Sequence, residues 1–145
     1  MTADLDRLVE GLERQVMEQA RAVYSDKVIQ EFHNPKNVGR MPAPDACGIV
    51  HGWCGDTMEV YLRLDGERIV QASFMTDGCG PTIACASMLT QMATGISLAE
   101  AARIEPEDLL ALLDGLPEEN AHCAELAVNT LREAITNGNE SRIER

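Results

Sequence analysis

The stretch from Met58 to Met75 constrains the fold more than any other part of the 145-residue sequence. Within it, apolar side chains alternate with polar or aromatic ones on both sides of Asp65-Gly66, a dipeptide typical of a tight hairpin turn. A shorter segment, 48–52, precedes the hairpin and predicts a further strand. We therefore expect a three-stranded antiparallel sheet. The alternating apolar residues are Met58, Val60, Leu62 and Leu64 before the turn, and Val70, Ala72 and Phe74 after it.

The predicted hairpin also brings two cysteines together. Cys54 lies just before one strand and Cys79 just after the other, and a hairpin places these two strand ends side by side. Gly55 follows Cys54, and a glycine stands on each side of Cys79, so both loops can turn sharply. A third segment, His122-Cys123, lies near the predicted start of a helix.

Helical signals dominate the rest of the chain, which predicts an α+β fold with a three-stranded antiparallel sheet packed against several helices. Proline, capping-box and glycine signals set the expected helix ends. The expected helices are 25–32, ended by Asn34-Pro35; 81–94; one opening at the capping box Ser97-Leu98-Ala99-Glu100; 106–113; and 118–136, with Gly138 as its stop. An extended loop is expected over 34–45, and a polar tail over 138–145.

The N-terminal segment, 1–22, is expected to form an extra amphipathic helix ahead of the main domain, 23–137. Its apolar residues recur at helical spacing, with acidic and basic residues between them. We favour packing of this helix on its own domain. The alternative is a contact with a partner or a homodimer, because the spacing resembles a short seam, but two heptads are few for a coiled coil. The apolar residues are Leu5, Leu8, Val9, Leu12 and Val16.

The composition narrows the class of protein. A net charge of −12 argues against nucleic-acid and anionic-membrane partners, which favour basic surfaces. No apolar run is long enough to span a membrane, and the acidic first ten residues do not resemble a secretory signal, so we expect a cytoplasmic protein. In that compartment, five cysteines indicate metal or redox chemistry rather than disulfides.

Five side chains are candidate metal ligands: Cys54, Asp56, Cys79, His122 and Cys123. Thiolate and imidazole groups favour zinc, copper(I) or iron–sulfur clusters. Three thiolates leave a fourth position for Asp56 or His122. A carboxylate or an imidazole is a poorer match to a cluster iron than a thiolate is. Such a ligand set suits a protein whose cluster must leave.

The remaining two cysteines are expected to be structural. Cys85 lies inside a predicted helix among small and apolar residues, which predicts core packing, with pairing to Cys79 as a minor alternative. Cys47 lies in the predicted loop before the first strand and is interpreted as structural.

The motifs together resemble a known family. Cys-Gly-Asp at 54–56, Gly-Cys-Gly at 78–80 and His-Cys at 122–123, with the upstream segments 24–29 and 34–39, resemble the U-type iron–sulfur cluster assembly scaffolds, IscU and the N-terminal domain of NifU. The resemblance runs from about residue 24 to about residue 135. It implies a scaffold rather than an enzyme, which receives sulfur from a cysteine desulfurase and passes a cluster to apo iron–sulfur proteins.

The same resemblance implies that the five candidate ligands hold the cluster, with 2Fe-2S expected, 4Fe-4S as an alternative and zinc as a substitute. A second hypothesis is a zinc-dependent sulfur acceptor resembling SufU. Such proteins typically carry an insertion between the second and third cysteine segments and lack the histidine before the last cysteine, so His122 and the compact spacing here favour the scaffold. A structural zinc domain fits the scattered ligands poorly.

One segment departs from the family pattern. Residues 116–120 read Leu-Pro-Glu-Glu-Asn, where many IscU proteins have a Leu-Pro-Pro-Val-Lys motif that a specialised Hsp70-type chaperone recognises. The second proline, the valine and the lysine are all absent. We therefore expect no chaperone recognition through this segment.

Overall fold

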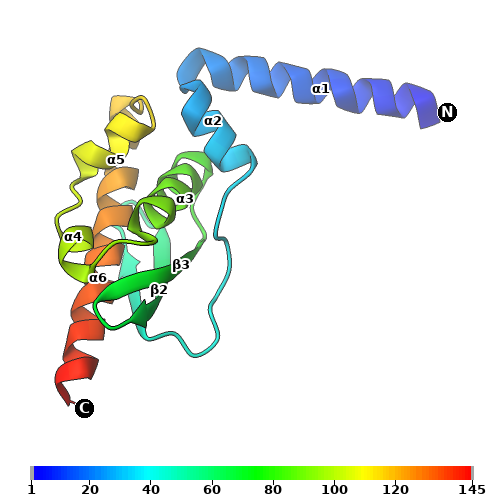
Figure 1. Ribbon diagram of the computed structural model, residues 1–145. Helices are drawn as coiled ribbons and strands as arrows, with labels where there is room; N and C mark the ends of the chain where they lie inside the picture. The colour runs from blue at the N-terminus through cyan, green and yellow to red at the C-terminus, as the bar shows by residue number, and fades with distance from the viewer. Residues whose placement is uncertain (1, 145) are drawn as a thin grey trace.

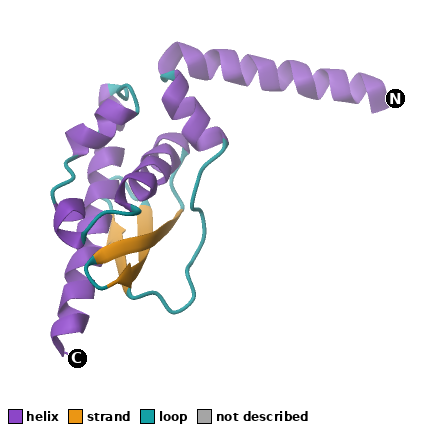
Figure 2. Ribbon diagram, in the orientation of Figure 1, coloured by secondary structure: helices purple, strands orange, loops and turns teal. Residues whose placement is uncertain are grey.

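The computed structural model describes residues 2–144 of the chain and the side chains of residues 3–139. A small antiparallel sheet lies against helices, with one long helix leading in at the N-terminus (Figures 1 and 2). This arrangement confirms the predicted α+β fold. In chain order the elements are α1 (Thr2–Val23), α2 (Asp26–His33), β1 (Ala46–His51), β2 (Thr57–Asp65), β3 (Arg68–Thr76), α3 (Gly80–Ala93), α4 (Leu98–Ala102), α5 (Pro106–Leu112), the 3-10 helix η1 (Glu118–Asn120) and α6 (His122–Glu144).

The sheet has the order β1-β2-β3, with both neighbouring pairs antiparallel. Val60 stands opposite Phe74 on one side and Gly48 on the other, which confirms the predicted hairpin. The first strand begins at Ala46, two residues earlier than expected. Cys47 therefore lies within β1 and not in the preceding loop, and its thiol is half-buried.

Local capping explains where several helices begin. The Ser25 hydroxyl accepts a hydrogen bond from the backbone N–H of Val28 (3.1 Å) and donates one to the Leu113 carbonyl (2.5 Å), so it starts α2 and ties it to the end of α5. Ser97 and Glu100 form the predicted capping box of α4.

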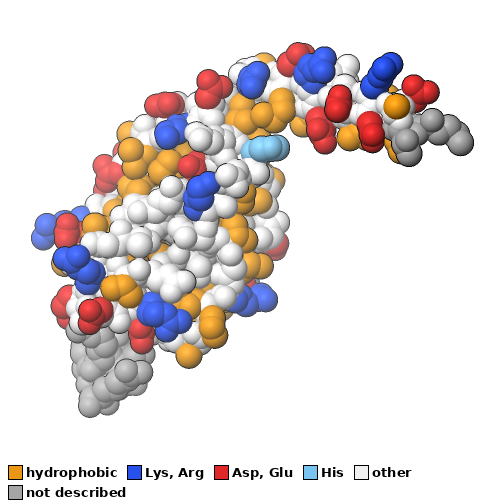
Figure 3. Space-filling view, turned by 45° about the vertical axis from the view of Figure 1, so that its right-hand side comes forward, with side chains coloured by type: hydrophobic (Ala, Val, Ile, Leu, Met, Phe, Trp, Pro, Cys, Tyr) orange, Lys and Arg blue, Asp and Glu red, His pale blue; other side chains and the backbone are white. Residues whose placement is uncertain are grey.

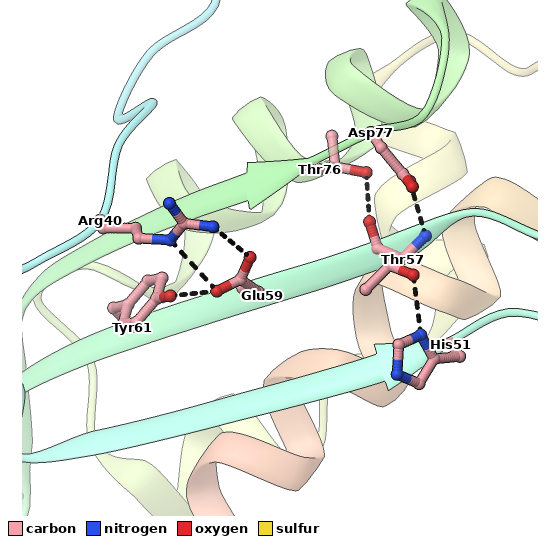
Figure 4. Close-up of polar contacts among 7 residues, drawn as sticks. All are labelled: Arg40, His51, Thr57, Glu59, Tyr61, Thr76 and Asp77. Atoms are coloured by element: carbon pink, nitrogen blue, oxygen red, sulfur yellow. Dashed lines mark hydrogen bonds and ion pairs between the residues drawn. The ribbon is translucent and has the colours of Figure 1, made fainter.

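The core lies between one face of the sheet and the helices α3 and α6. Met58, Val60 and Leu62 of β2 point into it and are at most 1% exposed. The loop 34–45 runs along the β3 edge, where Gly39 N–H donates to the Phe74 carbonyl (2.8 Å). Arg40 of this loop pairs with Glu59 (3.2 Å) on the outer face of the sheet, where Tyr61 also donates to Glu59 (Figure 4). Both hydrogen bonds lower the pKa of the Glu59 carboxyl, and the one from Tyr61 has the larger effect.

Close packing of α6 on β1 sets the position of the last helix. A Cβ atom at Gly48 would lie 2.4 Å from the backbone nitrogen of Ala134, so only glycine permits this approach. At Gly138 a Cβ atom would lie 2.8 Å from the Cβ of Ala46. The prediction that Gly138 ends the helix is wrong, because this glycine is a close packing position and α6 continues to Glu144. The segment predicted as a polar tail is therefore helical up to residue 144, and residue 145 lies outside the described residues.

Helix α1 does not pack on its own domain, and the interpretation we favoured from the sequence is wrong on this point. Figure 1 shows α1 extending away from the rest of the molecule, which it meets near α2. Its apolar residues, from Leu5 (58% exposed) to Val16 (62%), face solvent. The amphipathic pattern predicted the helix and its row of apolar residues, but it carried no information on what covers that row.

Candidate functional site

The candidate site lies at the end of the sheet where β2 begins and β3 ends. Thr57, the first residue of β2, donates its backbone N–H to the Asp77 carboxylate (2.7 Å), and its carbonyl accepts from the Thr76 hydroxyl (2.7 Å). On its other side the Thr57 hydroxyl meets Nδ1 of His51 at 2.7 Å (Figure 4). These bonds hold the segment carrying Cys54 and Asp56 beside the segment carrying Cys79.

The Cys54 loop is a compact turn. Gly52 N–H donates to the Asp56 carbonyl (2.7 Å), and Gly55 N–H donates to the Gly52 carbonyl (3.0 Å). Gly55 has a φ of 96°, a conformation that side-chain-bearing residues rarely adopt. The turn leaves the Cys54 side chain exposed and the Asp56 side chain partly buried.

Cys79 stands at the N-cap position of α3, and it is exposed. A Cβ atom at Gly78 would lie 2.6 Å from the Thr82 side chain, so the loop depends on glycine there. A Cβ atom at Gly80 would lie 3.4 Å from the ring of Phe32. Because the first N–H groups of a helix have no partner within the helix, this position favours a negatively charged group.

His122 and Cys123 lie at a helix start, as expected, but α6 begins at His122 and not at residue 118, because residues 118–120 form the separate 3-10 helix η1. Cys123 is only 1% exposed, unlike Cys54 and Cys79. The hydroxyl of Thr82 lies between two predicted ligands, because it donates to the Asp56 carboxylate (3.1 Å) and lies 3.4 Å from Sγ of Cys123. The Cys54 loop, α3 and α6 thus meet through this one buried threonine.

Burial is the main reason that the pKa of the Cys123 thiol is raised, and the hydrogen bond with Thr82 opposes it. The neighbouring Cys79, Cys54 and Asp56 raise the same pKa further, since each is a source of negative charge. Three of the predicted ligands, Cys79, Cys54 and Asp56, therefore lie close enough to Cys123 to act on it electrostatically.

The fifth predicted ligand, His122, lies beside the only tryptophan of the sequence. The ring centroids of Trp53 and His122 are 5.0 Å apart, and Trp53 is 84% exposed. Nε2 of His122 lies 3.8 Å from Sγ of Cys123. The Trp53 ring therefore covers one side of the histidine at the edge of the site.

The predicted ligands share one end of the molecule, but their side chains do not form a closed site. Within residues 2–144, no three His, Cys, Asp or Glu side chains are already grouped tightly enough to hold a metal ion. Two of the thiols, Cys54 and Cys79, are exposed at the surface. The arrangement is an open group of thiol, imidazole and carboxylate side chains, unlike the closed site of a structural zinc domain.

The other two cysteines lie outside the site, as expected. Cys85 is fully buried in the core, and burial, with a smaller effect of Cys123, raises the pKa of its thiol so strongly that the thiol stays protonated. This position confirms the prediction of core packing. The Cys47 side chain lies on the outer face of the sheet. The backbone carbonyl of Cys47 accepts a hydrogen bond from the Asn137 side chain of α6 (2.8 Å).

Sequence reasoning missed three residues that adjoin the predicted ligands: Asp77, Thr82 and Tyr24. Asp77 joins the two loops, and its place between a strand and Gly-Cys-Gly was an available signal. Thr82 follows Pro81 in the first helical turn and carries no comparable signal. Burial raises the pKa of the Tyr24 phenol, and the neighbouring Cys79 and Cys123 raise it further, so Tyr24 borders the thiols from the end of α1.

Comparison with known proteins identifies the family. The family described as NifU-like N terminal domain matches residues 23–144, which is most of the chain. The chain belongs to this family. Members of the NifU-like N-terminal family that resemble it include an archaeal protein, "Iron-sulfur cluster assembly scaffold protein IscU 1" of Archaeoglobus fulgidus, which is 42% identical over 114 residues, 78% of this chain and 74% of that protein.

Two further relatives show the same relationship in bacteria. The protein named "Iron-sulfur cluster assembly scaffold protein IscU" of Haemophilus influenzae is 38% identical over 117 residues, 77% of this chain and 92% of the relative. "Nitrogen fixation protein NifU" of Azotobacter chroococcum is 39% identical, but the match covers only 38% of that longer protein.

Solved structures support the fold of this NifU-like domain. A NifU-like N-terminal protein from Brucella abortus superposes with a TM-score of 0.66 at 20% identity, over 81% of this chain and 95% of the other. A SufU-type scaffold from Fervidobacterium islandicum gives a TM-score of 0.66 at 18% identity, over 80% and 98%. At such identities the likeness concerns the fold alone.

None of the helices in the described part of the chain is both long enough and apolar enough to cross a membrane.

Proposed function

We propose that this chain is a scaffold on which an iron–sulfur cluster is assembled and from which the cluster is passed to apo-proteins. One observation carries the proposal: three cysteines from three separate segments meet at one end of the sheet, beside Asp56 and His122. The relatives named IscU support it, because they are named as cluster assembly scaffolds and match most of this chain. The cluster is the cargo of such a protein.

The residues present suit this cargo. Cys54, Cys79 and Cys123 would supply thiolates, and Asp56 or His122 would complete the set. Two exposed thiols and one buried thiol make a site that a cluster can enter and leave from one side. The oxygen or nitrogen ligand binds cluster iron less strongly than a fourth thiolate, which favours release. We propose a 2Fe-2S cluster, with zinc as a substitute on the same ligands in purified samples that carry no cluster.

The sulfur would come from a cysteine desulfurase that docks at the same end of the molecule, because Cys54 and Cys79 are exposed there. We further propose that residues 116–120 do not recruit a dedicated chaperone. Glu118 and Glu119 stand on the short helix η1, where they replace the apolar and basic side chains that a peptide-binding groove would recognise.

Anaerobic reconstitution with iron and sulfide, followed by Mössbauer spectroscopy, tests the scaffold function and reports the cluster type. We expect Cys54→Ser, Cys79→Ser and Cys123→Ser each to abolish a stable cluster. Cys47→Ser is the matched control, because this half-buried cysteine lies on the outer face of the sheet and should be dispensable.

Two results would contradict the proposal. Equal loss of the cluster in the control would show that the assignment of the ligands is wrong. Binding of zinc with no cluster under any reconstitution condition, together with sulfur transfer from a desulfurase, would instead favour the SufU-like sulfur acceptor.

A further inference from the structure

The proposed scaffold function does not use the exposed apolar stripe of α1. Figure 3 shows apolar side chains along one side of this helix, which extends from the folded domain. Such contiguous apolar surfaces usually mark contacts with another molecule. The residues of the stripe are all between 44% and 62% exposed: Leu5, Leu8, Val9, Leu12, Val16 and Val23.

The folded domain does not cover this stripe. The side of α1 that faces α2 carries Met17 and Ala20, which are partly buried, and the stripe lies next to them around the helix, where its residues stay 44% to 62% exposed. Between Val9, Leu12 and Val16 on α1 and Phe32 on α2 there is an open hollow of about 1040 Å³. A second helix, with a diameter of about 10 Å, has room to lie along the stripe.

The spacing of the stripe fits a heptad seam. Valines at 9, 16 and 23 occupy every a position from residue 9 onward, and the leucines at 5 and 12 occupy d positions, with Gln19 as the third d residue. β-Branched residues at a with leucine at d favour a two-stranded parallel coiled coil. The f positions, which point away from the seam, are all arginine: Arg7, Arg14 and Arg21.

We propose that α1 pairs with α1 of a second copy of this chain in a parallel, two-stranded coiled coil. The parallel arrangement places Gln19 opposite Gln19 of the second copy, where the two side-chain amides can bond to each other. An antiparallel pair centred on the stripe would set Gln19 against Val9 and leave a polar group unpaired at the seam.

The charges beside the seam favour the same direction. Asp6 and Glu13 occupy e positions. In an antiparallel pair, e faces e, which would place Glu13 near Glu13 of the second copy. In a parallel pair, e faces g, and the g residues Leu8 and Gln15 are uncharged. The parallel dimer avoids that repulsion and holds the two cluster sites at the same end of the pair.

Sedimentation velocity of the full chain tests the pairing. We expect a mass of twice the 15.8 kDa chain, and a return to the single-chain mass in the double variant Leu12→Gln, Val16→Gln. The matched control is Arg7→Gln, Arg14→Gln on the outer face of the same helix, which should stay dimeric. Thermal melting should be similar in both variants, because α1 lies outside the folded core.

The direction of the pair is tested in the Val16→Cys variant. Under mild oxidation, peptide mapping should find residue 16 linked to residue 16 of the second copy, as the parallel seam requires. A parent protein that is monomeric over its whole soluble concentration range, or a dimer that the seam variant does not weaken, would overturn the pairing. Absence of the 16-to-16 link in a confirmed dimer would overturn the parallel arrangement.

Other occupants of the stripe give distinct results. Hydrogen exchange that shows α1 protected in a monomer would mean that the helix folds back on its own domain. Protection that appears only on addition of a cysteine desulfurase would assign the stripe to that partner. Either result would overturn the pairing, and neither would bear on the proposed cluster site.

Discussion

Replacing Thr82 with valine tests whether the buried hydroxyl prepares the site for metal. The hydroxyl lies 3.1 Å from the Asp56 carboxylate and 3.4 Å from Sγ of Cys123, and the residue is fully buried. While Cys123 is protonated, its thiol can donate to the hydroxyl, which in turn donates to Asp56. When Cys123 ionises, the hydroxyl can turn its hydrogen to the thiolate and stabilise it.

The expected size of the effect follows from that single hydrogen bond. A net contribution of about 1 kcal/mol corresponds to a rise of about 0.7 in the pKa of Cys123 on removal of the hydroxyl. Because metal binds the thiolate, zinc affinity at neutral pH should fall about fivefold. Unfolding of the metal-free Thr82→Val variant should require about 1–2 kcal/mol less free energy, since the Asp56 hydrogen bond is also lost.

Competition with a chromophoric zinc chelator, measured at neutral and alkaline pH, provides the assay. The deficit of Thr82→Val should shrink at alkaline pH, where Cys123 is ionised in both proteins. Thr82→Ser keeps the hydroxyl and should bind zinc as the parent does. The reasoning is refuted if Thr82→Val matches the parent at neutral pH, or if Thr82→Ser is equally defective.

Three further predictions follow from single positions. Gly48→Ala should lower the free energy of unfolding by about 1–3 kcal/mol in denaturant titrations, because its Cβ would lie 2.4 Å from a backbone nitrogen of α6, whereas Gly11→Ala, with open space around it, should not. Burial raises the pKa of Cys85, so the metal-free protein should keep its full free energy of unfolding below the ordinary thiol pKa. Above that pH, the free energy of unfolding should fall by about 1.4 kcal/mol per pH unit. An equally steep fall in Cys85→Ala would contradict this. The fluorescence of Trp53, whose ring is tilted by 54° to the neighbouring ring of His122, should change when zinc binds, and an unchanged spectrum at zinc saturation would argue against a metal site beside Trp53.

Local signals predicted most of the elements. Alternation around Asp65-Gly66 predicted the hairpin, and the capping residues Ser25 and Ser97 marked helix starts because their bonds lie within one helical turn. Gly138 misled the prediction for a physical reason. Glycine has poor intrinsic helix propensity, but its lack of a side chain lets α6 pack closely against Ala46. That packing, which no local pattern contains, favours continuation of the helix.

The sequence by itself determined which candidate ligands this protein carries, in which order they stand, and that a hairpin would bring Cys54 beside Cys79. Only the tertiary structure decided that Cys123 is buried while the other two thiols are exposed, because burial depends on how α6 lies against the sheet. It also decided that Thr82 joins Asp56 to Cys123 and that α1 leaves its own domain. Periodicity describes one element at a time, whereas these features depend on contacts between residues far apart in the chain.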